Sequence, residues 1–205
     1  AAITTLLLTV LKPGDHVVAG EVIYGGTVRL LRDLLGGFGV LVTFVDTTDL
    51  AATEAAFRPS TKLLFVETPA NPTLAICDLA ELGKLAKAAR VLFAVDNTFL
   101  TSVQQPVFVH GADVAVLSTT KYVEGHDSTT GGALLTDDPK LNERLALTRS
   151  ATGSIQAPMD AWLTLRGIKT LPLRLAAHSA SALSIAKLLE AHPSVGAVHY
   201  PGLES

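Results

Sequence analysis

Short apolar runs alternate with stretches of helical periodicity along most of the chain. Runs of about four or five largely apolar residues, without polar alternation, indicate strands that are buried on both faces. These runs lie at 16–19, 41–45, 63–66, 91–95, 114–117 and 133–135. Patterns typical of helices lie at 1–11, 28–35, 50–57, 79–89, 139–149, 158–166 and 172–191. Buried strands separated by helices predict an α/β fold, in which a mostly parallel sheet is covered by helices on both faces.

Residues with strong local preferences mark the expected ends of two helices. Asp78 precedes a periodic stretch and is predicted to be its N-cap, because its carboxylate accepts the free N–H groups of a first turn. Thr27 is predicted to cap the helix at 28–35 in the same way. Gly36 and Gly37 are predicted to end that helix.

Composition narrows the classes of function. The formal net charge of −3 gives no basic field for nucleic acid or an anionic membrane surface. The apolar stretch at 1–11 is shorter than the about 20 residues of a membrane span. A single cysteine, Cys77, excludes an internal disulfide and a cysteine-cluster metal site, and predicts a cytoplasmic protein.

The chain is also unusually poor in charge. Charged residues make up 17% of it and mean hydropathy is +0.40, whereas soluble domains average about 25% charged residues. This predicts that part of the surface is covered, either by another subunit or by further segments of a larger chain.

Polar residues follow several of the predicted strands. In parallel sheets, ligands bind beyond the carboxyl ends of the strands, so these residues are the candidates for chemistry. They are Tyr24, Glu67-Thr68-Pro69, Asp96-Asn97-Thr98 and Ser118-Thr119-Thr120-Lys121, with Asn71 in the turn that follows Glu67. Together they predict one site with an aromatic ring, an amide, a buried carboxylate, hydroxyls and a lysine.

Two of these residues carry distinctive chemistry. Asp96 ends an apolar strand, so it is either a cap or ion-pair partner, or a fixed anion that faces a cationic ligand atom or a metal. Three hydroxyl residues precede Lys121 and a glycine-bearing polar run follows it. Such a loop suits a phosphate, and a desolvated lysine there can act as a Schiff-base nucleophile. The alternative for Lys121 is a solvated loop lysine.

Other motifs are weaker or missing. Tyr24 is either a turn aromatic or a stacking face for a planar ligand, and Asn71 precedes a proline in what is otherwise a simple turn. No Walker A motif occurs, and the glycines at 36–39 lack the GxGxxG spacing. His126 and Asp127 are adjacent, but no second ligand cluster supports a metal site.

Several motifs in one order resemble the Cys/Met metabolism family of pyridoxal 5′-phosphate (PLP) enzymes. They are Tyr24-Gly-Gly-Thr, Glu67-Thr-Pro-Ala-Asn-Pro-Thr73, Val95-Asp-Asn-Thr-Phe99, Ser118-Thr-Thr-Lys-Tyr122 and Arg166-Gly-Ile-Lys-Thr-Leu171. The family includes cystathionine γ-synthase, cystathionine γ- and β-lyase, methionine γ-lyase and O-acetylhomoserine sulfhydrylase. The resemblance spans essentially all 205 residues. It implies the large domain of the aspartate-aminotransferase-like fold (fold type I).

The resemblance also implies roles for single residues. Lys121 matches the lysine that binds the cofactor covalently and then moves protons on the substrate. Asp96 matches the aspartate that keeps the pyridine nitrogen protonated, and Tyr24 matches the tyrosine that stacks on the ring and takes part in proton transfer. The remaining matches are cofactor contacts: Ser118 and Thr120 at the phosphate, Asn71 near the phenolic oxygen, and Thr98 behind these groups.

The sequence departs from the family pattern at its ends. The Ser-Gly-Met type turn that precedes the first helix in the family is absent, as are the N-terminal arm and the arginine that binds the substrate carboxylate. We therefore expect residues 1–192 to be a PLP-binding large domain without its N-terminal part, and 193–205 to begin a small C-terminal domain. Leu117 stands where many relatives have histidine.

The resemblance implies a transsulfuration enzyme of the cystathionine γ-lyase or γ-synthase type. Its reaction would be γ- or β-elimination, or γ-replacement, on sulfur amino acids or activated homoserine. Family members form dimers of dimers with active sites at subunit interfaces, which implies the same here. Methionine γ-lyase and O-acetylhomoserine sulfhydrylase are the alternatives within the family, disfavoured by Gly26 and by Tyr122 respectively. A nucleotide-binding α/β domain and a non-catalytic fragment are the alternatives of another class.

Overall fold

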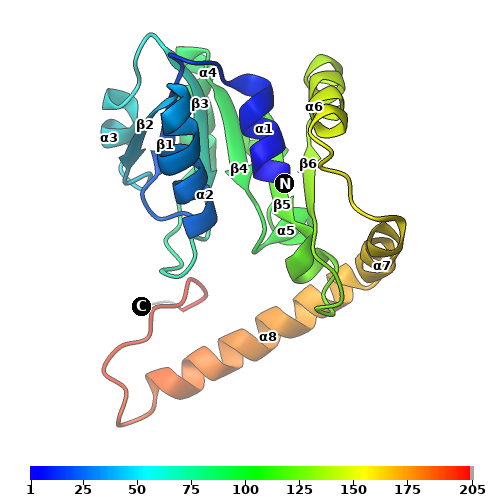
Figure 1. Cartoon of the computed structure of the whole chain (residues 1–205). Coiled ribbons are helices and arrows are strands. Elements are labelled where there is room, and N and C mark those ends of the chain that lie inside the picture. The colour runs from blue at the N-terminus through cyan, green and yellow to red at the C-terminus, as the bar shows by residue number, and fades with distance from the viewer. Residues whose placement is uncertain (204–205) are drawn as a thin grey trace.

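A six-stranded sheet forms the centre of the molecule in the computed structural model, which describes residues 1–203 (Figure 1). The strand order is β2-β1-β3-β4-β5-β6. β1 to β5 pair in parallel, and β6 pairs antiparallel to β5. The strands are β1 (His16–Gly20), β2 (Leu41–Val45), β3 (Thr61–Glu67), β4 (Leu92–Asp96), β5 (Val114–Ser118) and β6 (Gly132–Leu135). The predicted mostly parallel sheet is confirmed.

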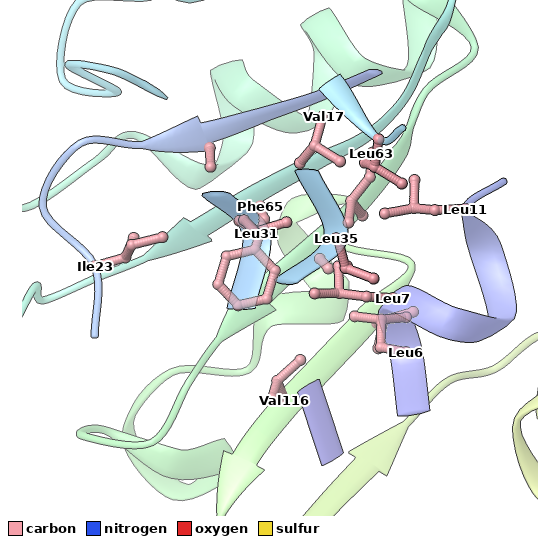
Figure 2. Packing of buried hydrophobic residues seen from close by; sticks show 14 of the residues in the cluster. Leu6, Leu7, Leu11, Val17, Ile23, Leu31, Leu35, Leu63, Phe65 and Val116 are labelled. Atoms are coloured by element: carbon pink, nitrogen blue, oxygen red, sulfur yellow. The ribbon is translucent and has the colours of Figure 1, made fainter. Parts of the chain in front are cut away.

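Helices cover both faces of this sheet. The side chains of each central strand alternate between the faces and are buried on both, so each face has its own apolar core. Figure 2 shows the first core, which includes Leu6, Leu31 and Phe65. Its helices are α1 (Ala2–Val10), α2 (Gly25–Arg29), η1 (Leu30–Leu35) and α6 (Pro139–Ala151). The opposite core is covered by α3 (Leu50–Ala55), α4 (Leu79–Ala89) and the 3₁₀ turn η3 (Val107–His110).

The last helices lie beside and beyond the sheet. α7 (Pro158–Ile168) and the long α8 (Leu171–Glu190) follow α6, and α8 contacts the short helix α5 (Thr101–Gln104) and the turn η4 (Thr119–Val123). In Figure 1, α8 extends past the edge of the sheet and the chain then folds back toward it. None of the helices within residues 1–203 is long and apolar enough to cross a membrane.

The predicted second domain, 193–205, is represented at 193–203 by turns and by chain without regular secondary structure. Its last two residues, 204 and 205, lie outside the described part of the chain. The division of the chain at residue 192 therefore stays a prediction.

The predicted cap at Thr27 is wrong. α2 begins at Gly25 with Tyr24 as its N-cap, because the Tyr24 carbonyl accepts the N–H groups of Thr27 and Val28. Thr27 is thus inside the helix, and its hydroxyl is buried without a hydrogen-bond partner among residues 1–203. By contrast, the predicted N-cap at Asp78 is confirmed, since its carboxylate accepts two N–H groups of α4.

The helix end predicted at Gly36 and Gly37 is also displaced. Both glycines continue the helical course in the 3₁₀ turn η2 (Gly36–Phe38). The chain turns away at Gly39, whose φ of +83° is a left-handed conformation that favours glycine.

A buried histidine ties together the three strands at one side of the sheet. The His16 ring lies between hydroxyl groups of the neighbouring strands, with Nδ1 2.8 Å from Thr61 Oγ1 and Nε2 2.9 Å from Thr43 Oγ1. The side chain is fully buried. Burial, and then the positive charge of Arg58, lowers the pKa of His16, so the folded protein holds it neutral.

We predict a pH dependence of stability from His16. As the pH falls below the ordinary value of 6.5, the unfolded chain takes up a proton that the folded chain does not, so stability decreases. His16→Gln should reduce this slope in urea unfolding of the full-length apoprotein between pH 7.5 and 5.5. At pH 7.5 it should cost about 1–3 kcal/mol, because buried hydroxyls lose their partners. An unchanged slope would contradict this.

Candidate active site

A cavity of about 880 Å³ opens at the carboxyl ends of the central strands. The ends of β3, β4 and β5 place Glu67, Asp96 and Ser118 in its wall. The seven residues that the family resemblance assigned to the site all line this cavity: Tyr24, Asn71, Asp96, Thr98, Ser118, Thr120 and Lys121. The fold therefore brings together side chains that are spread over nearly a hundred residues of sequence.

Asp96 is the buried charge of the site. It is the last residue of β4 and is only 7% exposed. One carboxylate oxygen, Oδ1, accepts both the hydroxyl of Thr98 (2.5 Å) and the Thr98 N–H (3.1 Å). Burial raises the pKa of Asp96 more than these two hydrogen bonds lower it. Within residues 1–203 no cationic side chain pairs with Asp96, so the carboxylate is suited to a cationic atom of a ligand.

Thr98 connects the two strand ends on either side of the cavity. Its hydroxyl donates to Asp96 and accepts the backbone N–H of Ser118 at 2.9 Å. This hydroxyl therefore fixes the orientation of the Asp96 carboxylate relative to the start of the loop that carries Lys121. This contact is how Thr98 supports, from behind, the groups that are expected to contact the cofactor.

Glu67 is a site residue to which the sequence assigned no role. It ends β3, stands in register with Asp96 on β4, and is 7% exposed. Its two carboxylate oxygens accept the backbone N–H groups of Tyr24 (2.6 Å) and Asn71 (3.0 Å). One buried side chain thus holds the backbone of two predicted site residues. Its place directly after an apolar run is the sequence signal that could have indicated a role for Glu67.

The two carboxylates also influence each other. Burial raises the pKa of Glu67, and the nearby charge of Asp96 raises it further, while the N–H groups of Tyr24 and Asn71 lower it. Two acids in register at the end of a parallel sheet create a negative potential at the floor of the cavity. A cationic group that enters there relieves this repulsion.

Tyr24 lies over the start of α2. Its ring packs directly on Gly26, where any Cβ atom would collide with the ring carbons. The Tyr24 side chain is half exposed and lines the cavity, so one face of the ring is available to a ligand. A side chain at the second glycine of the Tyr-Gly-Gly-Thr motif would therefore force the Tyr24 ring to shift.

Lys121 lies in the turn η4, which follows β5. Its backbone leaves the helical region, with φ −88° and ψ −123°, so the turn is broken at the lysine itself. The side chain is exposed to the cavity. Beside it, the Thr120 hydroxyl accepts the Gly131 N–H at 2.9 Å and donates to the Gly131 carbonyl at 3.2 Å. This joins the lysine turn to the segment that leads into β6.

Two further segments line the cavity that sequence patterns did not indicate. They are the start of α1, at Ala1, Ala2 and Ile3, and the loop 153–157 between α6 and α7. In this loop Gln156 donates to the Thr130 carbonyl (3.3 Å) and the Thr164 hydroxyl (3.2 Å). The N–H groups of a first helical turn attract anions, so the start of α1 suits the same phosphate as the Ser118 and Thr120 hydroxyls.

Comparison with known proteins identifies the family. The family model of the Cys/Met metabolism PLP-dependent enzymes matches residues 1–205. The chain belongs to this family. It is 45% identical to cystathionine γ-synthase of Mycobacterium leprae over its whole length and 44% identical to cystathionine γ-lyase of Bacillus subtilis over 98% of it.

Solved structures agree with the sequence relatives. The crystal structure of cystathionine γ-lyase from Lactobacillus plantarum complexed with L-serine matches 99% of the chain, with a TM-score of 0.96 and 43% identity. The match includes 53% of that chain, and 53% of each of the two relatives above. The chain thus spans about half the length of these proteins. Its fold is that of fold type I PLP enzymes.

The cavity fits the cofactor of the family. PLP carries a pyridine nitrogen, an aldehyde and a phosphate, and the wall offers a different group for each. Asp96 is a buried carboxylate without a cationic partner among residues 1–203, and Lys121 is an exposed amine. Ser118, Thr120 and the first turn of α1 also line the cavity and supply donors. These residues are chemically complementary to PLP.

Proposed function

We propose that the chain is the cofactor-binding part of a transsulfuration enzyme of the cystathionine γ-synthase or γ-lyase type. The observation that carries this proposal is the meeting of Lys121 and the buried Asp96 on one cavity. Relatives with both names are about equally similar to the chain, so the reaction class is proposed as γ-elimination or γ-replacement. The substrates would be cystathionine or an activated homoserine.

Each residue has a defined task in this proposal. PLP, when bound, supplies an electron sink for negative charge that develops at the substrate Cα. Lys121 would hold the cofactor and then take the proton from Cα, and Asp96 would keep a proton on the ring nitrogen. Tyr24 would cover one face of the ring and exchange a proton with the amine or the leaving group. Ser118, Thr120 and Asn71 would fix the position of the cofactor, with Thr98 and Glu67 supporting them from behind.

The proposal includes an assembly. Many large apolar side chains of α7 and α8 are exposed, among them Trp162, Leu173 and Leu188. Exposed apolar surface of this extent is typical of a protein interface. We therefore propose a homo-oligomer, a dimer of dimers with active sites at the interfaces, in the cytoplasm. Residues 1–192 would be the large domain and 193–205 the entry to a second one.

The test uses the full-length protein with PLP. Borohydride treatment should fix the mass of the reduced cofactor on the peptide that contains Lys121. Each candidate reaction gives a different product: 2-oxobutyrate from γ-elimination of cystathionine, pyruvate from β-elimination, and cystathionine from activated homoserine with cysteine. We expect one of the γ reactions to dominate. The proposal fails if Lys121 carries no adduct, or if neither γ reaction gives its product.

A further inference from the structure

An arginine remote in sequence holds the turn that carries Lys121. Arg174 lies in the first turns of α8, and its guanidinium makes four hydrogen bonds. Two of them go to the carbonyls directly after the lysine, Tyr122 at 2.7 Å and Val123 at 3.3 Å. The other two go to the Gly167 carbonyl (2.8 Å) and the Thr170 hydroxyl (3.1 Å).

Arg174 contacts the turn directly after the residue at which its helical backbone is interrupted. The backbone is not helical at Lys121, so the regular ladder of η4 is interrupted there. Two N–H groups close the turn: Glu124 donates to Thr119 (2.9 Å) and Gly125 donates to Lys121 (2.8 Å). The carbonyls at the C-terminal end of a helical turn carry partial negative charge, which a guanidinium offsets.

Two glycines allow the approach. A Cβ atom on Gly125 would collide with the Arg174 guanidinium, and the φ of +77° at Gly125 also favours glycine. A Cβ atom on Gly167 would collide with the backbone of Glu124. The corner between α7 and α8 is therefore pressed directly against the end of the lysine turn. This gives a physical role to the Arg166–Leu171 motif, which the proposed mechanism does not use.

We propose that Arg174 is a positioning residue for Lys121. It touches neither the cavity nor the reacting atoms, and it acts by holding the carbonyls of Tyr122 and Val123 so that the broken turn keeps one conformation. Lysine is a poor substitute, because a single ammonium cannot reproduce a planar fork that reaches three carbonyls and a hydroxyl. That Arg174 holds the turn does not depend on the proposed function. Only the effect of this contact on the chemistry of Lys121 rests on the proposed function.

The first experiment measures amide hydrogen exchange in the full-length apoprotein. Arg174→Lys should speed exchange of the Glu124 and Gly125 amides by about tenfold or more, because these N–H groups close the turn. Arg149→Lys is the matched control, since Arg149 is exposed on α6 and outside the turn. Leu145→Ala controls for general destabilisation, because Leu145 lies on α6 and is buried in the core that α6 shares with α1. Thr170→Val removes a partner of the Arg174 side chain and should give a smaller change of the same kind, which also serves if Arg174→Lys does not fold.

The second experiment measures how fast Lys121 reacts with added PLP, trapped by borohydride at successive times. We expect the rate to fall at least severalfold in Arg174→Lys and to stay unchanged in Arg149→Lys. Unchanged exchange at Glu124 and Gly125, or an equal local increase in Leu145→Ala, would overturn the positioning role. Failure of wild-type Lys121 to react would overturn the proposed function, whereas the exchange result would still stand.

Discussion

Replacement of Lys121 by alanine is expected to lower kcat/KM of the full-length enzyme by about 10³-fold or more. Alanine removes both the amine that holds the cofactor and the base that moves the proton at Cα, and positioned proton transfer alone contributes about 10²–10⁴-fold. The lysine is not buried in a core, since its side chain is exposed to the cavity. The fold should therefore be unaffected.

The measurement combines steady-state kinetics with borohydride trapping. Lys121→Ala should lose the PLP adduct on its peptide while its thermal unfolding midpoint without cofactor stays within a few degrees of the wild type. Lys140→Ala, an exposed lysine at the start of α6, is the matched control and should retain both activity and adduct. Retention of more than a tenth of the activity in Lys121→Ala would show that another group performs the chemistry.

Asp96→Asn is expected to lower kcat/KM by about 10²- to 10³-fold, the magnitude seen when one preorganised electrostatic contact is removed from an active site. Asparagine has the same shape and can still accept the Thr98 hydroxyl through its carbonyl oxygen. It lacks the charge that would hold a proton on the ring nitrogen. The loss of kcat/KM would therefore measure the electrostatic contribution of the Asp96 charge, because the packing is preserved. Asp113→Asn is a suitable control, because Asp113 lies at the other end of the sheet beside Phe93.

The same substitution should make the cofactor-free protein more stable at neutral pH. Burial raises the pKa of Asp96, so the group favours the folded state at low pH and loses this contribution as the pH rises through the folded-state pKa. Asparagine does not ionise, so the stability advantage of Asp96→Asn over the wild type should grow from pH 4 to pH 7. Chemical unfolding of both apoproteins at several pH values measures this. A variant that is less stable than the wild type at pH 7 would contradict a buried, unpartnered charge.

If Asp96→Asn lowers activity and raises the stability of the apoprotein, the carboxylate serves a ligand. A carboxylate that serves the structure would not give this combination. A structural carboxylate is stabilised by its protein partners, so its removal lowers stability whether or not a ligand is present. Asp96 accepts only Thr98 among the described residues, whereas Glu67 accepts two backbone N–H groups from separate segments. The two acids at neighbouring strand ends thus have different tasks.

Much of the fold followed from local patterns. Apolar runs such as the one before Asp96 specified strands buried on both faces, and their separation by helices specified a parallel sheet, because parallel strands need crossover connections. The rule that ligands bind beyond the carboxyl ends of such strands then pointed to the polar residues at the strand ends, and the family resemblance assigned seven residues to the cofactor site. The errors fell at Thr27 and at Gly36–Gly37, where backbone contacts from Tyr24 and the turn at Gly39 set the helix ends.

The sequence by itself determined which side chains meet, because a parallel sheet brings its strand ends to one edge whatever the loops do. Only the tertiary structure decided how they are held. Glu67 clamps the backbone of Tyr24 and Asn71, Thr98 joins Asp96 to the lysine loop, and Arg174 closes the turn after Lys121. These contacts join segments up to 52 residues apart and end on backbone atoms. Backbone N–H and C=O groups are the same at every position, so no sequence pattern marks which of them a distant side chain will bind.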